Sequence, residues 1–89
     1  MTPSATNLGP HTSMTTLADL VPGRSGTIAG FRDPGPVVHR LMQLGVIEGQ
    51  SFTVVRTAPM GDPIEIEILG YALSLRRSEA GVVLVSEVA

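Results

Sequence analysis

Few side chains in this sequence could carry out catalysis or hold a metal ion. There are two histidines, His11 and His39, and no cysteine. The histidines are far apart in the chain, and neither has a partner at the i+4 spacing of a helical metal site. A site built on them would need carboxylates such as Glu48, Asp33 or Glu65, brought together by the fold. We therefore predict no required cofactor, and we expect any metal bound at these residues to be weak or adventitious.

Two further groups of charged residues could take part in chemistry. Glu65 and Glu67 share one face of a predicted strand, and paired carboxylates can act as an acid and a base. That face is expected to be exposed, so an ion pair between Glu65 and Arg76 is the simpler interpretation. Arg76 and Arg77 could act as arginine fingers, although a role in solubility is simpler. No phosphate loop, Ser/His/Asp set or cofactor fingerprint is present, and we predict that the protein is not an enzyme.

Composition narrows the class of partner. The chain has 89 residues, of which 43% are hydrophobic, and its formal net charge is −2. All its basic residues are arginines, and such a surface is a poor match for nucleic acid or anionic lipid. A small domain without disulfides fits a cytoplasmic protein. No apolar run is long enough to span a bilayer, and no signal-peptide pattern is present.

The chain divides into a short tail and one domain. Residues 1–14 contain Pro, Gly, Ser and Thr with little apolar content, which predicts a flexible tail. The domain is expected at 15–88. It begins with an apolar helical turn at 16–20, capped by Thr16. A first strand follows at 25–30, and its polar, Gly-flanked composition favours an edge position or a short strand.

One short helix is predicted at 36–44. Proline in its first turn and Asp33 just before it indicate the start, with Asp33 as the N-cap. Gly45 sits where a left-handed C-cap is wanted. The helix is too short to be stable alone, so it must dock on a sheet. Its inward face is predicted to carry Val37, Leu41 and Leu44.

The remaining elements are strands, expected at 51–58, 64–69, 72–76 and 82–88. Apolar and acidic residues alternate from Ile64, the period-2 pattern of a strand with one wet face. Gly70 and Tyr71 are predicted to form a two-residue hairpin turn that pairs Ile68 with Leu73. Together these features predict a small, mostly antiparallel β-barrel of about five strands with one inserted helix.

Three ordered blocks of sequence carry a family resemblance. They are Leu-Met-Gln-Leu-Gly-Val at 41–46, Ala-Pro-Met-Gly-Asp-Pro-Ile at 58–64, and Gly-Tyr-Ala-Leu-Ser-Leu-Arg at 70–76. With this spacing, residues 15–88 resemble the FeoA family of ferrous iron transport proteins. The resemblance implies an SH3-like barrel and a cytoplasmic accessory role. It also implies protein–protein contact with the GTP-binding region of the FeoB transporter.

An alternative function follows from the same resemblance. Similar modules occur at the C-terminus of iron- or manganese-dependent repressors, so a small Fe²⁺ or Zn²⁺ sensor or chaperone stays open. The sequence has no helix-turn-helix segment, which favours the transport role.

The predicted contact surface combines loops that a barrel would hold out to a partner. Methionine at the tip of a Pro/Gly turn adapts well to an irregular surface. Exposed strand edges leave a weak homodimer open. The predicted partner-binding residues are Pro59, Met60, Gly61, Asp62, Tyr71, Val46 and Ile47.

Overall fold

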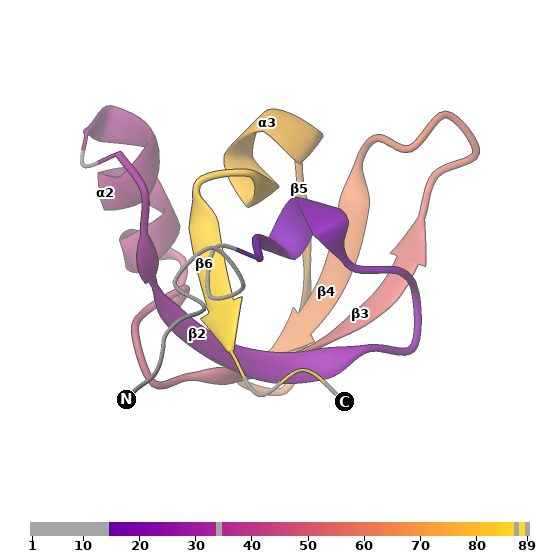
Figure 1. The fold of residues 1–89 in the computed structure, drawn as a ribbon, viewed down its shortest axis with the longest axis horizontal. Coiled ribbons are helices and arrows are strands. Elements are labelled where there is room, and N and C mark those ends of the chain that lie inside the picture. The colour runs from indigo at the N-terminus through magenta and orange to yellow at the C-terminus, as the bar shows by residue number, and fades with distance from the viewer. Residues whose placement is uncertain (1–14, 34, 87, 89) are drawn as a thin grey trace, which may run out of the picture.

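The protein folds as one antiparallel sheet with short helices beside it (Figure 1). The computed structural model describes residues 15–33, 35–86 and 88, so the predicted tail at 1–14 lies outside the described residues. The elements are η1 (Leu17–Asp19), β2 (Ser25–Phe31), α2 (Pro36–Gln43), β3 (Ser51–Thr57), β4 (Ile64–Ile68), β5 (Tyr71–Leu75), α3 (Arg77–Ala80) and β6 (Val83–Ser86). The strand order is β5-β4-β3-β2-β6, with every neighbouring pair antiparallel. The predicted mostly β fold with one short inserted helix is confirmed.

The core lies inside the curved sheet and is built almost entirely from aliphatic side chains. The alternation predicted for β4 is confirmed, since Ile64, Ile66 and Ile68 are all buried and the residues between them are not. η1 closes one end of the core with buried Leu17. Thr16 stands at the N-cap position of η1, as predicted, and its N–H donates to Asp19 Oδ2 at 2.9 Å.

The prediction that the first strand is an edge or a short strand was wrong. β2 has seven residues and lies between β3 and β6. Its glycine serves close packing: a Cβ on Gly26 would lie 2.9 Å from the Ser86 carbonyl oxygen and 3.1 Å from the Phe52 ring. Close packing in the interior of the sheet therefore requires glycine at this position. The glycine was misinterpreted as a sign of an edge strand, because the sequence does not show which strands lie beside it.

The predicted register of the β4–β5 hairpin was also wrong. The turn consists of Leu69 and Gly70, which both have positive φ, at 54° and 82°. Ile66 consequently pairs with Leu73, which was predicted to pair with Ile68. A shift of two residues keeps every apolar side chain on the same face, so the hydrophobic pattern could not distinguish the two registers. Leu69 at positive φ was the unexpected feature, because the turn type normally takes Asn or Gly there.

The helix was predicted well in extent and less well in orientation. α2 begins at Pro36, and Gly35 is its N-cap in place of Asp33, since the Gly35 carbonyl accepts the first helical bond from His39 at 2.9 Å. Gly45 has φ 99°, so a left-handed residue ends the helix as predicted, one position after the C-cap Leu44. The buried face carries Val38 and Leu41. Val37, predicted to be inward, is 40% exposed.

The apolar residues of α2 form two adjacent stripes along the helix, and the contacts with the rest of the domain determine which stripe is buried. The loop after the helix is tied back to it by a bond from the Val46 N–H to the Leu41 carbonyl at 3.0 Å.

Within the described residues, no helix is long and apolar enough to cross a bilayer.

Candidate functional site

The turn between β3 and β4, at residues 58–63, holds the most exposed large apolar side chain of the described residues. Met60 is 92% exposed at its tip. The turn closes on itself through a bond from the Gly61 N–H to the Ala58 carbonyl at 2.7 Å, and Gly61 has φ 86°. Below the tip, Ala58 N–H donates to Pro63 O at 3.0 Å. A closed main-chain turn therefore holds Met60 away from the sheet.

Arg77, at the start of α3, fixes this turn to the rest of the domain. Its Nε donates to the Gly61 carbonyl oxygen at 2.8 Å, and its Nη1 donates to the Ala18 carbonyl oxygen at 2.7 Å. Its main-chain N–H donates to Asp62 Oδ1 at 3.0 Å. Because the guanidinium is planar, one side chain can bridge the turn and η1 at the same time. Sequence reasoning missed this role, since residues 18, 61 and 77 are joined only by the fold.

A second group of predicted residues lies where the β4–β5 turn meets the end of α2. The Tyr71 hydroxyl donates to the Leu44 carbonyl oxygen. Leu69 packs over Gly45, where an added Cβ would lie 2.7 Å from Leu69 Cδ1. Tyr71 and Ile47 are 41% and 40% exposed, so both are available to a partner.

Val46 does not belong to that surface. It was included among the predicted contact residues, but its side chain is fully buried in the core. Of the two predicted contact residues in this loop, only Ile47 is therefore on the surface.

The structure separates the two groups of predicted contact residues. The Met60 turn precedes Ile64, which pairs with Leu75, whereas Tyr71 pairs with Ile68 at the other end of the same strand. Across five residues of β4 this separation is about 13 Å. The sequence prediction treated them as one surface, and the fold makes them two candidate surfaces at opposite ends of the β4–β5 hairpin (Figure 1).

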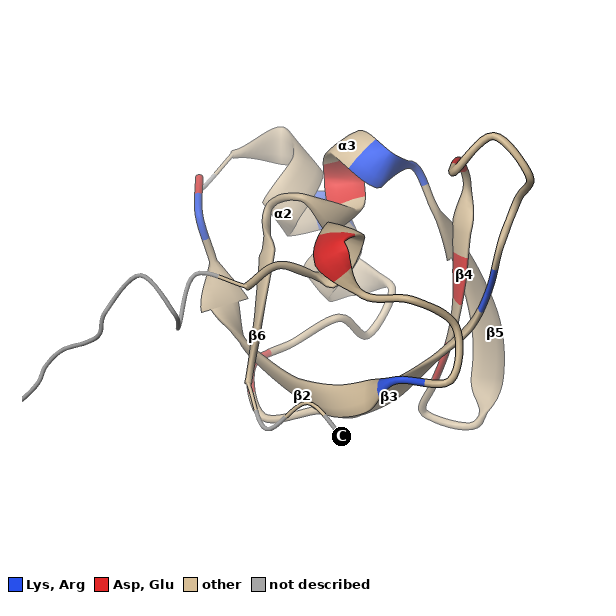
Figure 2. Ribbon diagram, turned by 45° about the vertical axis from the view of Figure 1, so that its right-hand side comes forward, with Lys and Arg blue, Asp and Glu red and all other residues tan. Residues whose placement is uncertain are grey.

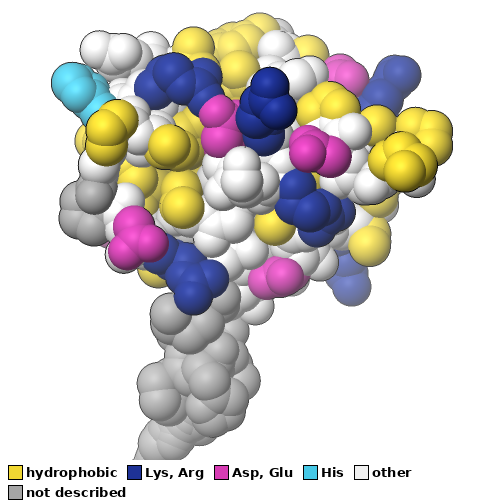
Figure 3. Space-filling model, turned by 90° about the horizontal axis from the view of Figure 1, so that it is seen from above, with side chains coloured by type: hydrophobic (Ala, Val, Ile, Leu, Met, Phe, Trp, Pro, Cys, Tyr) yellow, Lys and Arg dark blue, Asp and Glu magenta, His cyan; other side chains and the backbone are white. Residues whose placement is uncertain are grey.

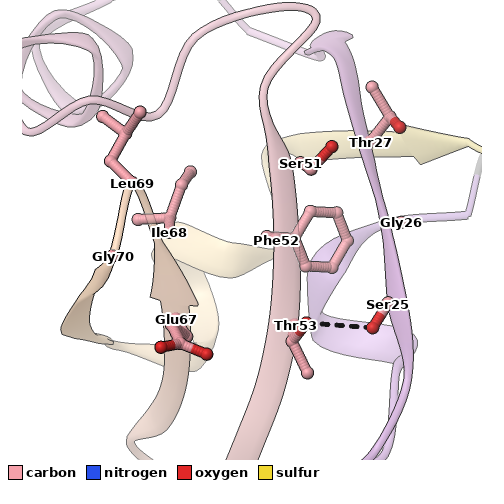
Figure 4. A pocket seen from close by; sticks show the side chains of 10 residues that line it. All are labelled: Ser25, Gly26, Thr27, Ser51, Phe52, Thr53, Glu67, Ile68, Leu69 and Gly70. Carbon is pink, nitrogen blue, oxygen red and sulfur yellow. Dashed lines mark hydrogen bonds between the residues drawn. The ribbon is translucent and has the colours of Figure 1, made fainter.

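An open groove on the sheet was not foreseen from the sequence (Figure 4). It has a volume of about 420 Å³ and lies across β2, β3 and the end of β4. The hydroxyls of Ser25 and Thr53 hydrogen-bond to each other at 2.9 Å, which uses two of its polar groups. Glu67 is the single charged residue in its lining, so the groove lacks the combination of groups that acid–base or nucleophilic chemistry requires. The alternating Ser and Thr residues of β2 and β3 were the sequence signal for it.

The candidate metal ligands do not form a cluster in the described residues. His39 is exposed on α2, with its Nε2 3.5 Å from Gln43 Nε2. Glu48 is exposed in the loop after the helix, and His11 lies outside the described residues. Within 15–33, 35–86 and 88, no group of three or more His, Asp or Glu side chains is placed to hold a metal ion.

The charged residues pair differently from the prediction. Glu65 faces Ser74 in the hairpin and forms its ion pair with Arg56 of β3, with 3.3 Å between Arg56 Nε and Glu65 Oε1. The predicted ion pair of Glu65 with Arg76 was wrong, because the two-residue shift in the hairpin register places Ser74 opposite Glu65. Arg40 of α2 pairs with Glu79 of α3. Charges of both signs alternate with apolar side chains over the face seen from above in Figure 3, where the β3–β4 turn projects at the right-hand edge.

Comparison with known proteins identifies the family. The model of the FeoA domain matches residues 15–87. A fusion protein from Porphyromonas gingivalis, described as Fe(2+) transport protein A/Fe(2+) transporter FeoB, is 34% identical over 64 residues. That match covers 72% of this chain and 8% of the fusion protein. This chain thus spans only a small part of the curated relative.

Solved structures agree with the family match. The FeoA-like protein of Clostridium acetobutylicum is 34% identical with a TM-score of 0.75, covering 80% of this chain and 83% of that one. The FeoA of Stenotrophomonas maltophilia, solved with zinc and described as an SH3 domain protein, is 28% identical with a TM-score of 0.72, over 81% and 89% of the two chains. A manganese-dependent transcriptional repressor shares the fold at 20% identity, with a TM-score of 0.72. The chain therefore belongs to the FeoA family, which is associated with ferrous iron transport.

Proposed function

We propose that this protein is a small cytoplasmic accessory factor of ferrous iron uptake. It acts without catalysis, by binding the cytoplasmic GTP-binding region of a FeoB-type transporter. The observation that carries the proposal is the fusion of a homologous module to a FeoB transporter in one chain. Fusion of two modules raises their effective concentration relative to each other, which favours modules whose function requires them to bind each other.

The Met60 turn is the surface that best fits this role. A methionine 92% exposed contributes nothing to the core, so its apolar surface is available to a partner. The bonds from Arg77 to Gly61 and Ala18 hold the turn in place before any partner arrives. A pre-ordered loop loses less conformational entropy on binding than a mobile one, which favours affinity.

The exposed residues Tyr71 and Ile47 form a second contact candidate. Tyr71 lies about 13 Å from the start of β4 along the strand, so one broad partner or two separate partners could use both surfaces. Substitutions at the two surfaces separate these cases, because each can be changed without touching the other.

A binding titration tests the proposal. The purified chain is titrated with the transporter's cytoplasmic GTP-binding domain in the GDP-bound and GTP-analogue-bound states. We expect saturable binding in at least one state. Absence of binding in both states, together with normal iron uptake in cells that lack the protein, contradicts the proposal.

One observation favours the alternative function of a metal sensor or chaperone: the similar protein of Stenotrophomonas maltophilia was solved with zinc. In this chain the candidate ligands are His39, His11 and Glu48. Calorimetric titration of the metal-free protein with Zn²⁺ and with Fe²⁺ under anaerobic conditions decides between the two functions. Micromolar or tighter binding that is lost in His39→Ala supports the sensor, and weak binding indifferent to His39 supports an adventitious site.

A further inference from the structure

The two edge strands of the sheet differ in how they are covered. Along the outer edge of β6, the Val85 N–H donates to the Thr15 carbonyl at 3.1 Å, and Thr16 forms a bridge with Leu84. The main chain of β5 pairs with β4 alone among the described residues, and the contact of β5 with the end of α2 is made by the Tyr71 side chain, whose hydroxyl donates to the Leu44 carbonyl. β5 is therefore an open strand edge, a feature that proteins usually cover or block.

The hairpin turn determines which main-chain groups of β5 point outward. In a two-residue turn, the closing hydrogen bond joins Tyr71 N–H to the Ile68 carbonyl. Hydrogen-bonded and non-hydrogen-bonded pairs then alternate along an antiparallel ladder. The odd-numbered residues of β5 consequently bond to β4, whereas Ala72 and Ser74 direct their N–H and C=O groups away from the sheet.

β5 has none of the features that block the addition of another strand. Its sequence, Tyr-Ala-Leu-Ser-Leu, contains no charged residue (Figure 2). It also contains no proline, and the ladder with β4 has no bulge. Ala72 and Ser74 are exposed, and Leu73 is only partly buried. An open depression of about 480 Å³ lies between Arg40 of α2 and the last residues of β5. The depression is also lined by Asp62 and Pro63 before β4 and by Glu79 of α3, so it opens at the C-terminal end of β5.

We propose that β5 is a self-association edge, which pairs antiparallel with β5 of a second copy about a two-fold axis at Leu73. In this register Ala72 of each copy lies opposite Ser74 of the other. The two outward N–H and two outward C=O groups of each copy are then all used, in four hydrogen bonds. If the two-fold axis lay at Ala72 or at Ser74, the two strands would form only two hydrogen bonds. The two Leu73 side chains meet as a non-hydrogen-bonded pair, where side chains are closest.

The self-complementarity of the edge is the reason to assign a second copy as its occupant. An isologous contact requires that one patch match itself under a two-fold rotation, and the placement of Ala72 and Ser74 on either side of Leu73 meets that requirement. The absence of charge on β5 removes electrostatic repulsion between the copies. A standard protein–protein interface buries about 800 Å² of surface per partner. The contact between two five-residue strands is smaller, so we expect a weak dimer.

Amide hydrogen exchange and sedimentation measured against protein concentration test the proposal. From about 10 μM to about 1 mM the weight-average mass should rise toward that of a dimer, as a dissociation constant in that range requires. Over the same range the exchange of the Ala72 and Ser74 amides should slow. The Tyr71 and Leu73 amides, already bonded to β4, should be protected at all concentrations.

Two substitutions address the edge without touching the core. Ser74→Pro removes one outward N–H per copy, hence two of the four bonds, and should raise the dissociation constant about tenfold or more. Ala72→Lys places a charge on the edge and should have a similar effect with the fold intact. Val55→Lys, at an exposed position of β3, adds the same charge away from the edge and should leave association unchanged.

Three results overturn the proposal. The first is a monomer at all concentrations. The second is a dimer that Ser74→Pro and Ala72→Lys do not weaken. The third is protection of the Ala72 and Ser74 amides that appears only when the transporter domain is added, which would assign the edge to that partner. The first two results do not depend on whether the protein acts in iron uptake.

Discussion

Arg77 holds Gly61 in place: its Nε donates to the Gly61 carbonyl oxygen at 2.8 Å. The same guanidinium reaches Ala18, so one side chain joins η1, α3 and the turn that carries Met60. An apolar side chain 92% exposed is thereby kept at a defined place on the surface. The bonds within the turn and the bonds from Arg77 together order the loop, and this order favours recognition of a partner.

Replacing Arg77 should loosen the turn. Arg77→Lys keeps the charge but loses the planar fork that reaches Gly61 and Ala18 together. We expect a loss of about 1 kcal/mol in the free energy of unfolding, measured by urea denaturation. Amide exchange at Gly61 should also become faster. Arg56→Lys, on an exposed ion pair of β3, is the control and should change stability by less than about 0.5 kcal/mol.

Alanine at Gly45, just after the C-cap of α2, should lower the free energy of unfolding more than alanine at Gly49 in the following loop. Gly45 and Gly49 both have positive φ, at 99° and 91°, so each substitution introduces similar backbone strain of about 1 kcal/mol. Only at Gly45 does the new Cβ meet a neighbour, with Leu69 Cδ1 at 2.7 Å and the Tyr71 hydroxyl at 3.1 Å. Gly45→Ala should therefore be more destabilising than Gly49→Ala in thermal unfolding. Equal losses would mean that Leu69 moves aside freely.

The hairpin turn offers a stabilising substitution. Leu69 has φ 54°, a conformation that asparagine tolerates better than leucine. Leu69→Asn creates the Asn-Gly pair preferred in such turns, and we expect a gain of about 0.5 to 1 kcal/mol in unfolding free energy. If the turn instead consisted of Gly70 and Tyr71, the change would be neutral or unfavourable. Chemical denaturation of the two proteins distinguishes these results.

Much of the fold could be predicted because its signals are local. The alternation of Ile64, Ile66 and Ile68 identified the buried face of β4, and Gly45 identified the end of α2. Family resemblance added the barrel topology. The register of β4 with β5 could not be obtained from the same pattern, since a shift of two residues preserves it.

The candidate site was harder to predict because it depends on distant contacts. Met60 was recognised from its place in a Pro/Gly turn. The Arg77 bonds to Gly61 and Ala18 join positions separated in the chain, and no periodicity encodes them. Val46 and Ile47 are adjacent apolar residues in a loop, and only the packing shows that the first is buried and the second exposed.

The dissociation constant of the complex with the transporter's cytoplasmic domain, compared between Met60→Glu and Val55→Glu, is the most direct test of the proposed contact. Both changes place a carboxylate on an exposed apolar position, at 92% and 41% exposure. Burying an unpaired charge in the contact should weaken the Met60→Glu complex about tenfold or more. Val55→Glu should bind as the unchanged protein does. Equal affinity for both variants and the unchanged protein would contradict a contact through the Met60 turn.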